Sequence, residues 1–291
     1  MVKVLIPSGA LGLGYDRAAL ARGIAQKPDI IAIDGGSTDS GPHYLGTGTS
    51  KYSRNSTKAE WRELMAARAE AGVPLVIGTA GTCGADDAVD WLVEITREIA
   101  AETGESLRLA VLKSGQDNQT MVAALRAGRI TPLPAAPEIS DTLLLECTNI
   151  VALAGAEQIQ EALNTGADII IAGRTTDTAI ISALPLARGC HAGGCWHGAK
   201  IGECGALATT SPNSGTIMIA FDAEGFTMTP MGAEARATPR TVSAHMLYEN
   251  SDPHILYEPG GHLDVRGATY TALNDREVRV TGSEWIVSDR Y

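Results

Sequence analysis

Four carboxylates and one thiol lie in Gly-rich segments of this sequence, and these side chains could carry out acid–base chemistry. Asp34 and Asp39 lie in DGGSTDSG, Asp177 in GRTTDT, and Glu203 with Cys204 in GECGAL. Carboxylates gathered at a semi-buried edge can have raised pKa values and exchange protons near neutral pH. We therefore expect these five residues to be catalytic. The structural alternative is that Asp177 only caps a helix.

Other polar or small residues stand beside these acids and are expected to bind a substrate. Arg174, or Lys113 at the end of another segment, could hold a substrate carboxylate through charge-assisted hydrogen bonds. His43 could serve as a base near neutral pH. The expected substrate-binding residues are Ser8, Gly9, Ser37, Thr38, His43, Thr79, Thr82, Cys83, Ser114, Gln116, Asn118, Arg174 and Thr175.

Two other chemistries stay open on the sequence. Three cysteines and two histidines lie close together, but their spacing lacks the C-x2-C pairs of structural zinc sites; they are Cys190, His191, Cys195, His197 and Cys204. Carboxylates at 34, 39 or 177 would suit a Mg²⁺ ion. A thiol nucleophile is the other option, because Cys83 and Cys204 stand near expected helix starts, which lower a thiol pKa. The structural alternative is that each cysteine is a small buried hydrophobe.

A repeated strand–loop–helix pattern must position these residues. Apolar runs at 2–6, 29–33, 74–77, 107–112 and 168–172 predict strands. Amphipathic or apolar stretches at 16–26, 57–71, 85–102, 122–127, 155–165 and 178–186 predict helices, and Thr57 with Glu60 fits a capping box. This alternation predicts an α/β fold with a doubly wound, mostly parallel sheet. The five polar, Gly-rich strand ends would then meet at one edge, where such sheets bind ligands.

A further short strand is expected at 150–153, before the helix at 155–165. The pattern changes after residue 208, where short strands are expected at 215–221, 227–231, 263–265 and 277–280, and a helix at 241–249. We therefore predict an α/β domain over 1–208 that carries the site and a smaller α+β region over 209–291. Because the chain stops soon after an expected strand, we expect this second region to be incomplete.

Composition excludes some classes of partner. The formal net charge is −11, from 23 basic and 34 acidic residues, and phosphate contacts need clustered Lys and Arg. Nucleic acid is therefore not expected as a partner. No apolar segment reaches the roughly 18 residues that span a bilayer. Without a membrane segment or signal peptide, the expected location is the cytoplasm, where the five cysteines would be reduced.

The loop after the first expected strand resembles a dinucleotide fingerprint only loosely. Gly9, Gly12 and Gly14 do not fit G-x-G-x-x-G, although Asp34 closes the second expected strand, where an acid could hold a ribose. An NAD(P)-dependent oxidoreductase is therefore an alternative function, but NAD is not the expected cofactor.

Three long segments resemble the acyclic terpene utilisation (AtuA-type) family: GADIIIAGRTTDTAIISALPLA, GECGALAT and HMLYENSDPHILYEPGGHLDV. The resemblance implies a role in the breakdown of citronellol-like terpenes through branched acyl-CoA intermediates. It also implies a chain that continues beyond Tyr291 and a small partner domain, fused or separate. The loop 34–41 departs from the family's more usual acidic stretch, which indicates a subgroup with another substrate.

These observations together predict a catabolic lyase or hydratase that acts on a branched hydroxy or unsaturated acid, free or as a CoA thioester. We expect a homo-oligomer. The alternatives are the oxidoreductase and a subunit that needs a small partner to complete its site. The sequence leaves the cofactor unassigned, with Mg²⁺ or another divalent metal as an option.

Overall fold

The computed structural model describes residues 1–36, 42–133, 135–248 and 250–288. At its centre is a nine-stranded sheet in the order β10-β11-β7-β6-β1-β2-β3-β5-β4. Five neighbouring strands are parallel, as the sequence predicted: β1 (Val2–Ile6), β2 (Ile30–Asp34), β3 (Leu75–Gly78), β5 (Ile169–Ala172) and β4 (Leu109–Leu112). Their carboxyl ends therefore share one edge of the sheet.

Antiparallel strands from the C-terminal part extend the same sheet. β6 (Ile217–Phe221) pairs with β1, and β7 (Gly225–Pro230), β11 (Val278–Thr281) and β10 (Thr269–Ala272) follow outward. The sheet thus runs across the expected boundary between residues 208 and 209, and the division into two domains stays a prediction. A separate three-stranded antiparallel sheet contains β8 (Ile255–Glu258), β9 (Gly261–Asp264) and β12 (Glu284–Val287).

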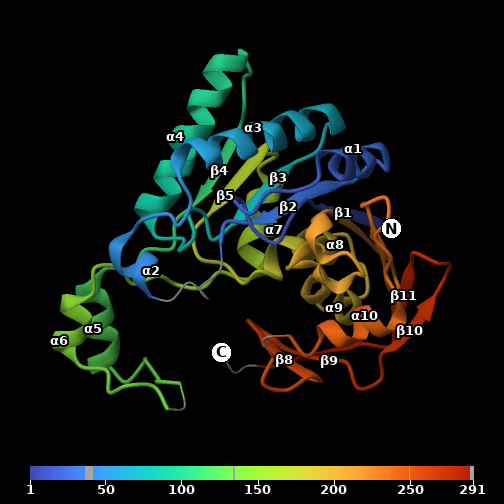
Figure 1. Cartoon of the computed structure of the whole chain (residues 1–291). Coiled ribbons are helices and arrows are strands. Elements are labelled where there is room, and N and C mark those ends of the chain that lie inside the picture. Colours follow the sequence, from blue (N-terminus) through green and yellow to red (C-terminus); the bar gives the residue numbers. More distant parts are fainter. Residues whose placement is uncertain (37–41, 134, 249, 289–291) are drawn as a thin grey trace.

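Helices cover both faces of the large sheet, as expected for a doubly wound fold (Figure 1). Successive residues of β2 show why: Ile31 and Ile33 join the apolar cluster on one face, whereas Ile30 and Ala32 join that on the other. One face packs against α1 (Arg17–Ala25), α3 (Arg54–Ala71) and α4 (Asp86–Thr103); the other packs against α7 (Ala156–Asn164), α8 (Ala179–Ala187) and α9 (Ala192–Gly202).

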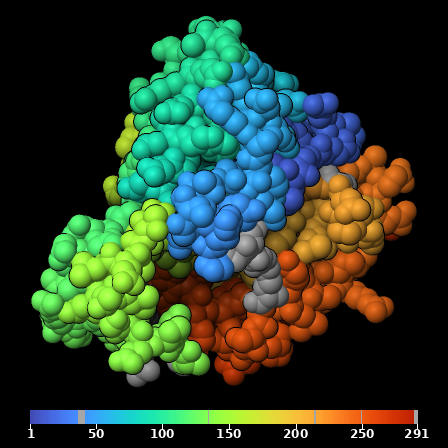
Figure 2. Space-filling model, turned by 60° about the vertical axis from the view of Figure 1, so that its left-hand side comes forward, coloured from blue at the N-terminus to red at the C-terminus, as the bar shows by residue number. Residues whose placement is uncertain are grey.

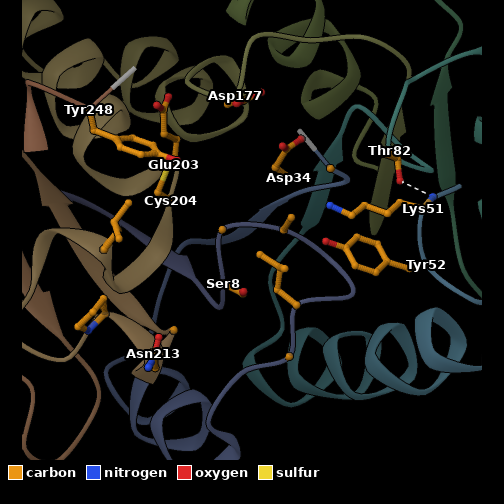
Figure 3. A pocket seen from close by; sticks show the side chains of 18 residues that line it. Ser8, Asp34, Lys51, Tyr52, Thr82, Asp177, Glu203, Cys204, Asn213 and Tyr248 are labelled. Atoms are coloured by element: carbon orange, nitrogen blue, oxygen red, sulfur yellow. Dashed lines mark hydrogen bonds between the residues drawn. The ribbon is translucent and has the colours of Figure 1, made fainter. Parts of the chain in front are cut away.

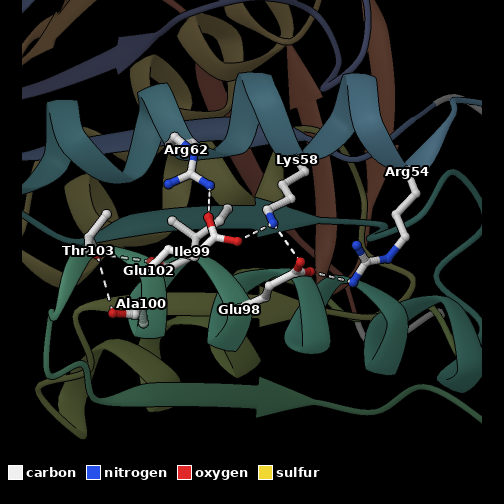
Figure 4. A network of polar contacts seen from close by, with 8 residues as sticks. All are labelled: Arg54, Lys58, Arg62, Glu98, Ile99, Ala100, Glu102 and Thr103. Carbon is white, nitrogen blue, oxygen red and sulfur yellow. Dashed lines mark hydrogen bonds and ion pairs between the residues drawn. The ribbon is translucent and has the colours of Figure 1, made fainter.

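An ion-pair ladder joins α3 to α4 on the outer surface (Figure 4). Glu98 accepts hydrogen bonds from Arg54 at 2.7 Å and Lys58 at 2.6 Å, and Glu102 accepts them from Lys58 and Arg62. Exposed pairs of this kind contribute at most about 1 kcal/mol each. The ladder fixes α3 relative to α4. This matters for the site because the segments that precede the two helices both reach the carboxyl edge of the sheet.

The remaining helices are short. They are α2 (His43–Thr47), α5 (Asn118–Arg126), α6 (Asp141–Glu146), α10 (Pro239–His245) and the 3-10 turns η2 (Gly205–Ala208) and η3 (Pro212–Ser214). α5 and α6 pack on each other at a distance from the central sheet (Figure 1). The sequence analysis did not predict α2, α6, β8, β10 or β12, because each spans only four to six residues.

Two sequence predictions of local structure are wrong. No strand covers 150–153; Val151 only forms an isolated bridge with Gly115. The helix expected from 57 begins at Arg54, since Ser53 accepts a hydrogen bond from the Ser56 N–H and is the true N-cap. Thr57 is buried inside α3 and does not start a capping box.

The Gly-rich segment after α8 forms the buried helix α9. Its glycines permit close packing that a side chain would prevent. A Cβ on Gly198 would lie 2.5 Å from the Phe221 ring, and one on Gly194 would lie 2.6 Å from the Gly225 Cα. The glycines therefore serve helix-to-sheet contact and do not form a flexible ligand loop.

We expect Gly194→Ala to lower the free energy of unfolding by about 1–3 kcal/mol, because the added methyl meets the backbone of β7. Gly46→Ala in α2 is the matched control, since a Cβ there meets nothing within 4 Å. It should raise stability by about 0.5–1 kcal/mol through the lower backbone entropy of alanine. Urea unfolding of both variants measures the difference, and equal effects would contradict the packing argument.

Candidate active site

A cavity of about 700 Å³ opens at the carboxyl edge of β1, β2, β3 and β5. Figure 2 shows the surface hollowed between the segment of α5 and α6 and the C-terminal strands, although neither of these lines the cavity itself. Loops that follow four parallel strands reach the cavity, together with the end of α9 and the segment before α3. The lining residues are Ser8, Gly9, Ala10, Leu13, Gly14, Asp34, Gly36, Lys51, Tyr52, Thr82, Asp177, Glu203, Cys204, Leu207, Pro212, Asn213, Gly215 and Tyr248.

Two carboxylates from different strands face each other across this edge. Asp34 is the last residue of β2 and is buried, and Asp177 follows β5 two strands away. Burial, together with the charge of Asp177, raises the pKa of Asp34 well above its ordinary value. Arg174 and the Gly35 N–H, which donates to Asp34 Oδ1 at 2.8 Å, only partly offset this. Asp34 can therefore hold a proton at pH values where an exposed aspartate cannot.

Glu203 extends this group of acids along the cavity wall. It is buried at the C-terminal end of α9 and forms an ion pair with Lys200, one turn earlier. Burial raises the pKa of Glu203 to about 8, because the charge of Lys200 offsets only part of the desolvation. Figure 3 shows Asp177 and Glu203 on one side of Asp34, and Lys51 with Tyr52 on the other.

Lys51 brings a cation to the cavity from the segment before α3. Its backbone N–H donates to Thr82 Oγ1 at 3.0 Å, which anchors this segment to the β3 loop. Its side chain points into the cavity toward Asp34 (Figure 3). Arg174 does not line the cavity, and its guanidinium donates to Thr79 Oγ1 at 3.4 Å. From this position outside the cavity, its positive charge lowers the pKa of Asp34.

The loop after β3 carries unusual backbone strain. Thr79 and Thr82 have φ values of 47° and 79°, a left-handed conformation that β-branched residues rarely adopt. The β2 loop packs so closely on them that a Cβ on Gly36 would lie 2.6 Å from the Thr82 Cα. Strain of this kind costs about 1–3 kcal/mol per residue and clusters at functional sites. The tight loop fixes Thr82, and through it Lys51, beside the two aspartates.

Only some of the predicted catalytic and substrate-binding residues line the cavity. Those that line it are Ser8, Gly9, Asp34, Thr82, Asp177, Glu203 and Cys204. Thr79, Cys83, Arg174 and Thr175 lie behind its wall on the same loops. Ser37, Thr38 and Asp39 fall outside the described residues. Lys51, Tyr52, Asn213 and Tyr248 were missed, because each comes from a segment whose place depends on long-range packing.

Four predicted substrate-binding residues lie away from the cavity, and three of them form hydrogen bonds within the fold. The Ser114 N–H donates to Asp86 Oδ1 at 3.1 Å, and the Gln116 side chain donates to the Ser114 carbonyl at 3.1 Å. Asn118 donates to the Cys147 carbonyl at 2.9 Å, and His43 starts the exposed helix α2. The β4 loop lies at the end of the parallel strands, where β4 has only β5 beside it. It is therefore too far along the edge to reach the cavity.

The two cysteines considered as nucleophiles both stand at helix starts. Cys83 precedes α4 as expected, but burial raises its pKa. Cys204 follows the C-cap of α9 and is the N-cap residue of the 3-10 turn η2. Cys195 is fully buried, and His197 is hydrogen-bonded at both ring nitrogens, to Ser283 and Tyr270. Within 1–36, 42–133, 135–248 and 250–288, no three His, Cys, Asp or Glu side chains form a group suited to a metal ion.

The β1 loop is poorly suited to a dinucleotide pyrophosphate. Ten residues separate the end of β1 from the start of α1, and a carboxylate occupies the helix N-terminus. Asp16 accepts a hydrogen bond from the Ala18 N–H at 2.8 Å, in the position where a phosphate would bind. A second negative charge there would be repelled.

Comparison with protein families identifies this chain. The model of the acyclic terpene utilisation family protein AtuA matches residues 47–285. The chain belongs to this family. The resemblance seen in the sequence is thereby confirmed, and membership of this family indicates involvement in acyclic terpene utilisation. Comparison with curated proteins and with solved structures finds no significant match.

The AtuA match divides the cavity into two parts. Lys51, Thr82, Asp177, Glu203 and Tyr248 lie inside the matched range, whereas the β1 and β2 loops with Ser8 and Asp34 precede it.

Among the residues that the structure describes, none of the helices combines the length and apolar character needed to cross a membrane.

Proposed function

We propose that this AtuA-family chain is a catabolic enzyme that adds water to, or removes it from, a branched hydroxy or unsaturated acid, free or as a CoA thioester. The observation that supports this most is the pair of carboxylates, Asp34 and Asp177, at one cavity with a cation nearby. Dehydration needs a base, an acid and a positive charge for the substrate's anionic group. The cavity offers one candidate for each.

In the direction of dehydration, Asp177 takes the proton from the carbon next to the substrate carbonyl. Protonated Asp34 gives its proton to the leaving hydroxyl, which departs as water, and the carbon–carbon double bond forms. The raised pKa of Asp34 favours this role, because a proton must be present before it can be given. In the direction of hydration, both proton transfers run in reverse.

The rest of the cavity suits a branched hydrocarbon beside an anionic group. Leu13, Leu207 and Pro212 supply apolar surface, while Lys51 supplies the charge. A volume of about 700 Å³ lies within the range of small-molecule sites, roughly 300–1,000 Å³. We propose that the acyl group occupies this space and that a CoA moiety, where present, extends outside it.

We expect Lys51→Met to raise the KM for an anionic substrate about tenfold or more while kcat changes little. The reason is that Lys51 binds the anionic group equally in the ground state and the transition state. Lys51→Arg keeps the charge and should restore most of the affinity. Steady-state kinetics of both variants provide the measurement; a loss confined to kcat would show that Lys51 does not have this binding role.

The function itself is tested by mass spectrometry of branched hydroxy and unsaturated acids and their CoA thioesters, each incubated with the protein. A gain or loss of 18 mass units, that of one water, supports the proposal, and a parallel series with chelator tests for a divalent metal. A cleaved carbon chain would establish a C–C lyase instead. If the folded protein changes no compound, the proposal fails. That the protein forms a homo-oligomer, that it has a small partner subunit and that it is located in the cytoplasm remain predictions.

A further inference from the structure

A second, smaller cavity lies behind Glu203, on the side away from Asp34. Its volume is about 190 Å³, and its polar lining includes Thr178, Lys200, Glu203, Ser251 and Glu258. Glu203 lines both this cavity and the larger one. A polar space of this size has room for about six waters at roughly 30 Å³ each. Water there would contact Glu203 from the side opposite the substrate.

Glu258 is the feature of this cavity that the proposed reaction does not use. It comes from β8, and its Oε1 accepts a hydrogen bond from Thr178 Oγ1 at 2.5 Å. Its Oε2 is buried and makes no hydrogen bond of good geometry among the residues that the structure describes, although the Thr176 hydroxyl is close enough to stabilise the ionised form in part. A buried carboxylate oxygen without a hydrogen bond is costly, so water in the cavity or a bound proton must satisfy it.

The charged and titratable groups around these two acids come from three elements. Lys200 on α9 pairs with Glu203, and its charge also acts on Glu258. Asp177 after β5 raises the pKa of both glutamates, and His245 on α10 faces Lys200 and stays neutral, because burial lowers its pKa to about 4. Burial raises the pKa of Glu258 to about 7. Both glutamates can therefore gain and lose protons near neutral pH.

We propose that Glu203 and Glu258 exchange protons through water in the second cavity, and that this cavity connects the acids of the active site to solvent. After hydration, in which Asp177 has given up its proton, a proton passes from solvent to Glu258, from Glu258 through water to Glu203, and from Glu203 to Asp177. After dehydration, in which Asp177 has gained a proton, the same transfers run in reverse. Each glutamate on the path gives one proton and receives one, so both return to their starting charge. That this path serves catalysis rests on the proposed function; the exchange itself does not.

The path is tested first without any substrate, by infrared spectroscopy of the carboxyl stretch of protonated Glu203. The variant Glu203→Gln identifies this band by its loss. After transfer to D₂O, the band shifts as the proton is replaced. Ser251 is exposed and lines the second cavity, so Ser251→Trp should block it and slow the shift several-fold. Ser106→Trp, at an exposed site outside both cavities, is the matched control. Equal exchange rates in both variants would overturn the proposal.

Glu258→Gln tests the coupling of the two acids in the same spectra. The charge of Glu258 raises the pKa of Glu203, so the midpoint of the Glu203 band should fall when that charge is removed. An unchanged midpoint would contradict the proposal. Where a substrate is known, Glu258→Gln should lower kcat at an unchanged KM, and small acidic buffers should restore it. If no substrate reacts but the infrared results hold, the proposed function fails and this inference stands.

Discussion

Asp34→Asn is expected to lower kcat by a factor of about 10²–10⁴ and to raise the thermal stability of the protein at the same time. The loss follows from the removal of the proton donor, whose contribution in acid–base catalysis lies in that range. The gain follows because burial raises the pKa of Asp34, so that folding near pH 7.5 must either protonate this carboxyl or bury its charge, and asparagine avoids both costs. The Asn side-chain oxygen can still accept the hydrogen bond from the Gly35 N–H.

The reciprocal variant Asp177→Asn should lower kcat by a similar factor, since it removes the base. It should also lower the pKa of Asp34 by removal of the neighbouring negative charge. Steady-state kinetics near pH 7.5 measure kcat, and thermal unfolding at the same pH measures stability. Asp90→Asn, an exposed carboxylate on α4 whose side chain is 61% accessible, is the control and should change neither. Full activity in both Asp34→Asn and Asp177→Asn would refute the assigned site.

The parallel sheet could be predicted because its signals are local. Each parallel strand is a short apolar run closed by glycine or a polar residue, and the helices between them are amphipathic or apolar. The antiparallel half is different. β10 and β12 are short and largely exposed, and they are defined by pairing with β11 and β9, respectively, and not by an apolar pattern of their own. Local pattern could not reveal contacts that depend on the complete sheet.

The candidate site shows the same limit. Asp34 and Asp177 could be found because each ends or follows a parallel strand, and topology alone places them at one edge. Lys51 and Tyr248 stand in segments with no strand nearby, and packing on Thr82 or His245 places them. The surroundings of the cysteines also depend on burial that the sequence does not reveal: Cys195 lies buried in α9, and burial raises the pKa of Cys83 beside α4.

The stability of the protein is expected to fall by about 2 kcal/mol as the pH rises from 6.5 to 8. Folded Glu203 has a pKa of about 8 against an ordinary value of 4.5, so over this interval the folded state holds a proton that the unfolded state lacks. Each pH unit then costs about 1.4 kcal/mol. Two histidines oppose this trend only at lower pH. His197 and His245 have pKa values lowered to about 3 and 4, so their effect is complete above their ordinary value of 6.5.

Urea unfolding at several pH values between 6.5 and 8 measures this slope in the wild-type chain and in Glu203→Gln. The variant removes this titrating group but keeps Asp34 and Glu258, whose raised pKa values also make stability fall with rising pH. Its stability should therefore still fall, with a slope smaller than that of the wild-type chain by about 1 kcal/mol per pH unit. Its absolute stability is a separate matter, because Lys200 loses its buried partner and such a loss is costly. The slope is therefore the deciding quantity. A wild-type stability that rises with pH, or equal slopes in both proteins, would show that Glu203 is already ionised at neutral pH and cannot take part in the proton path.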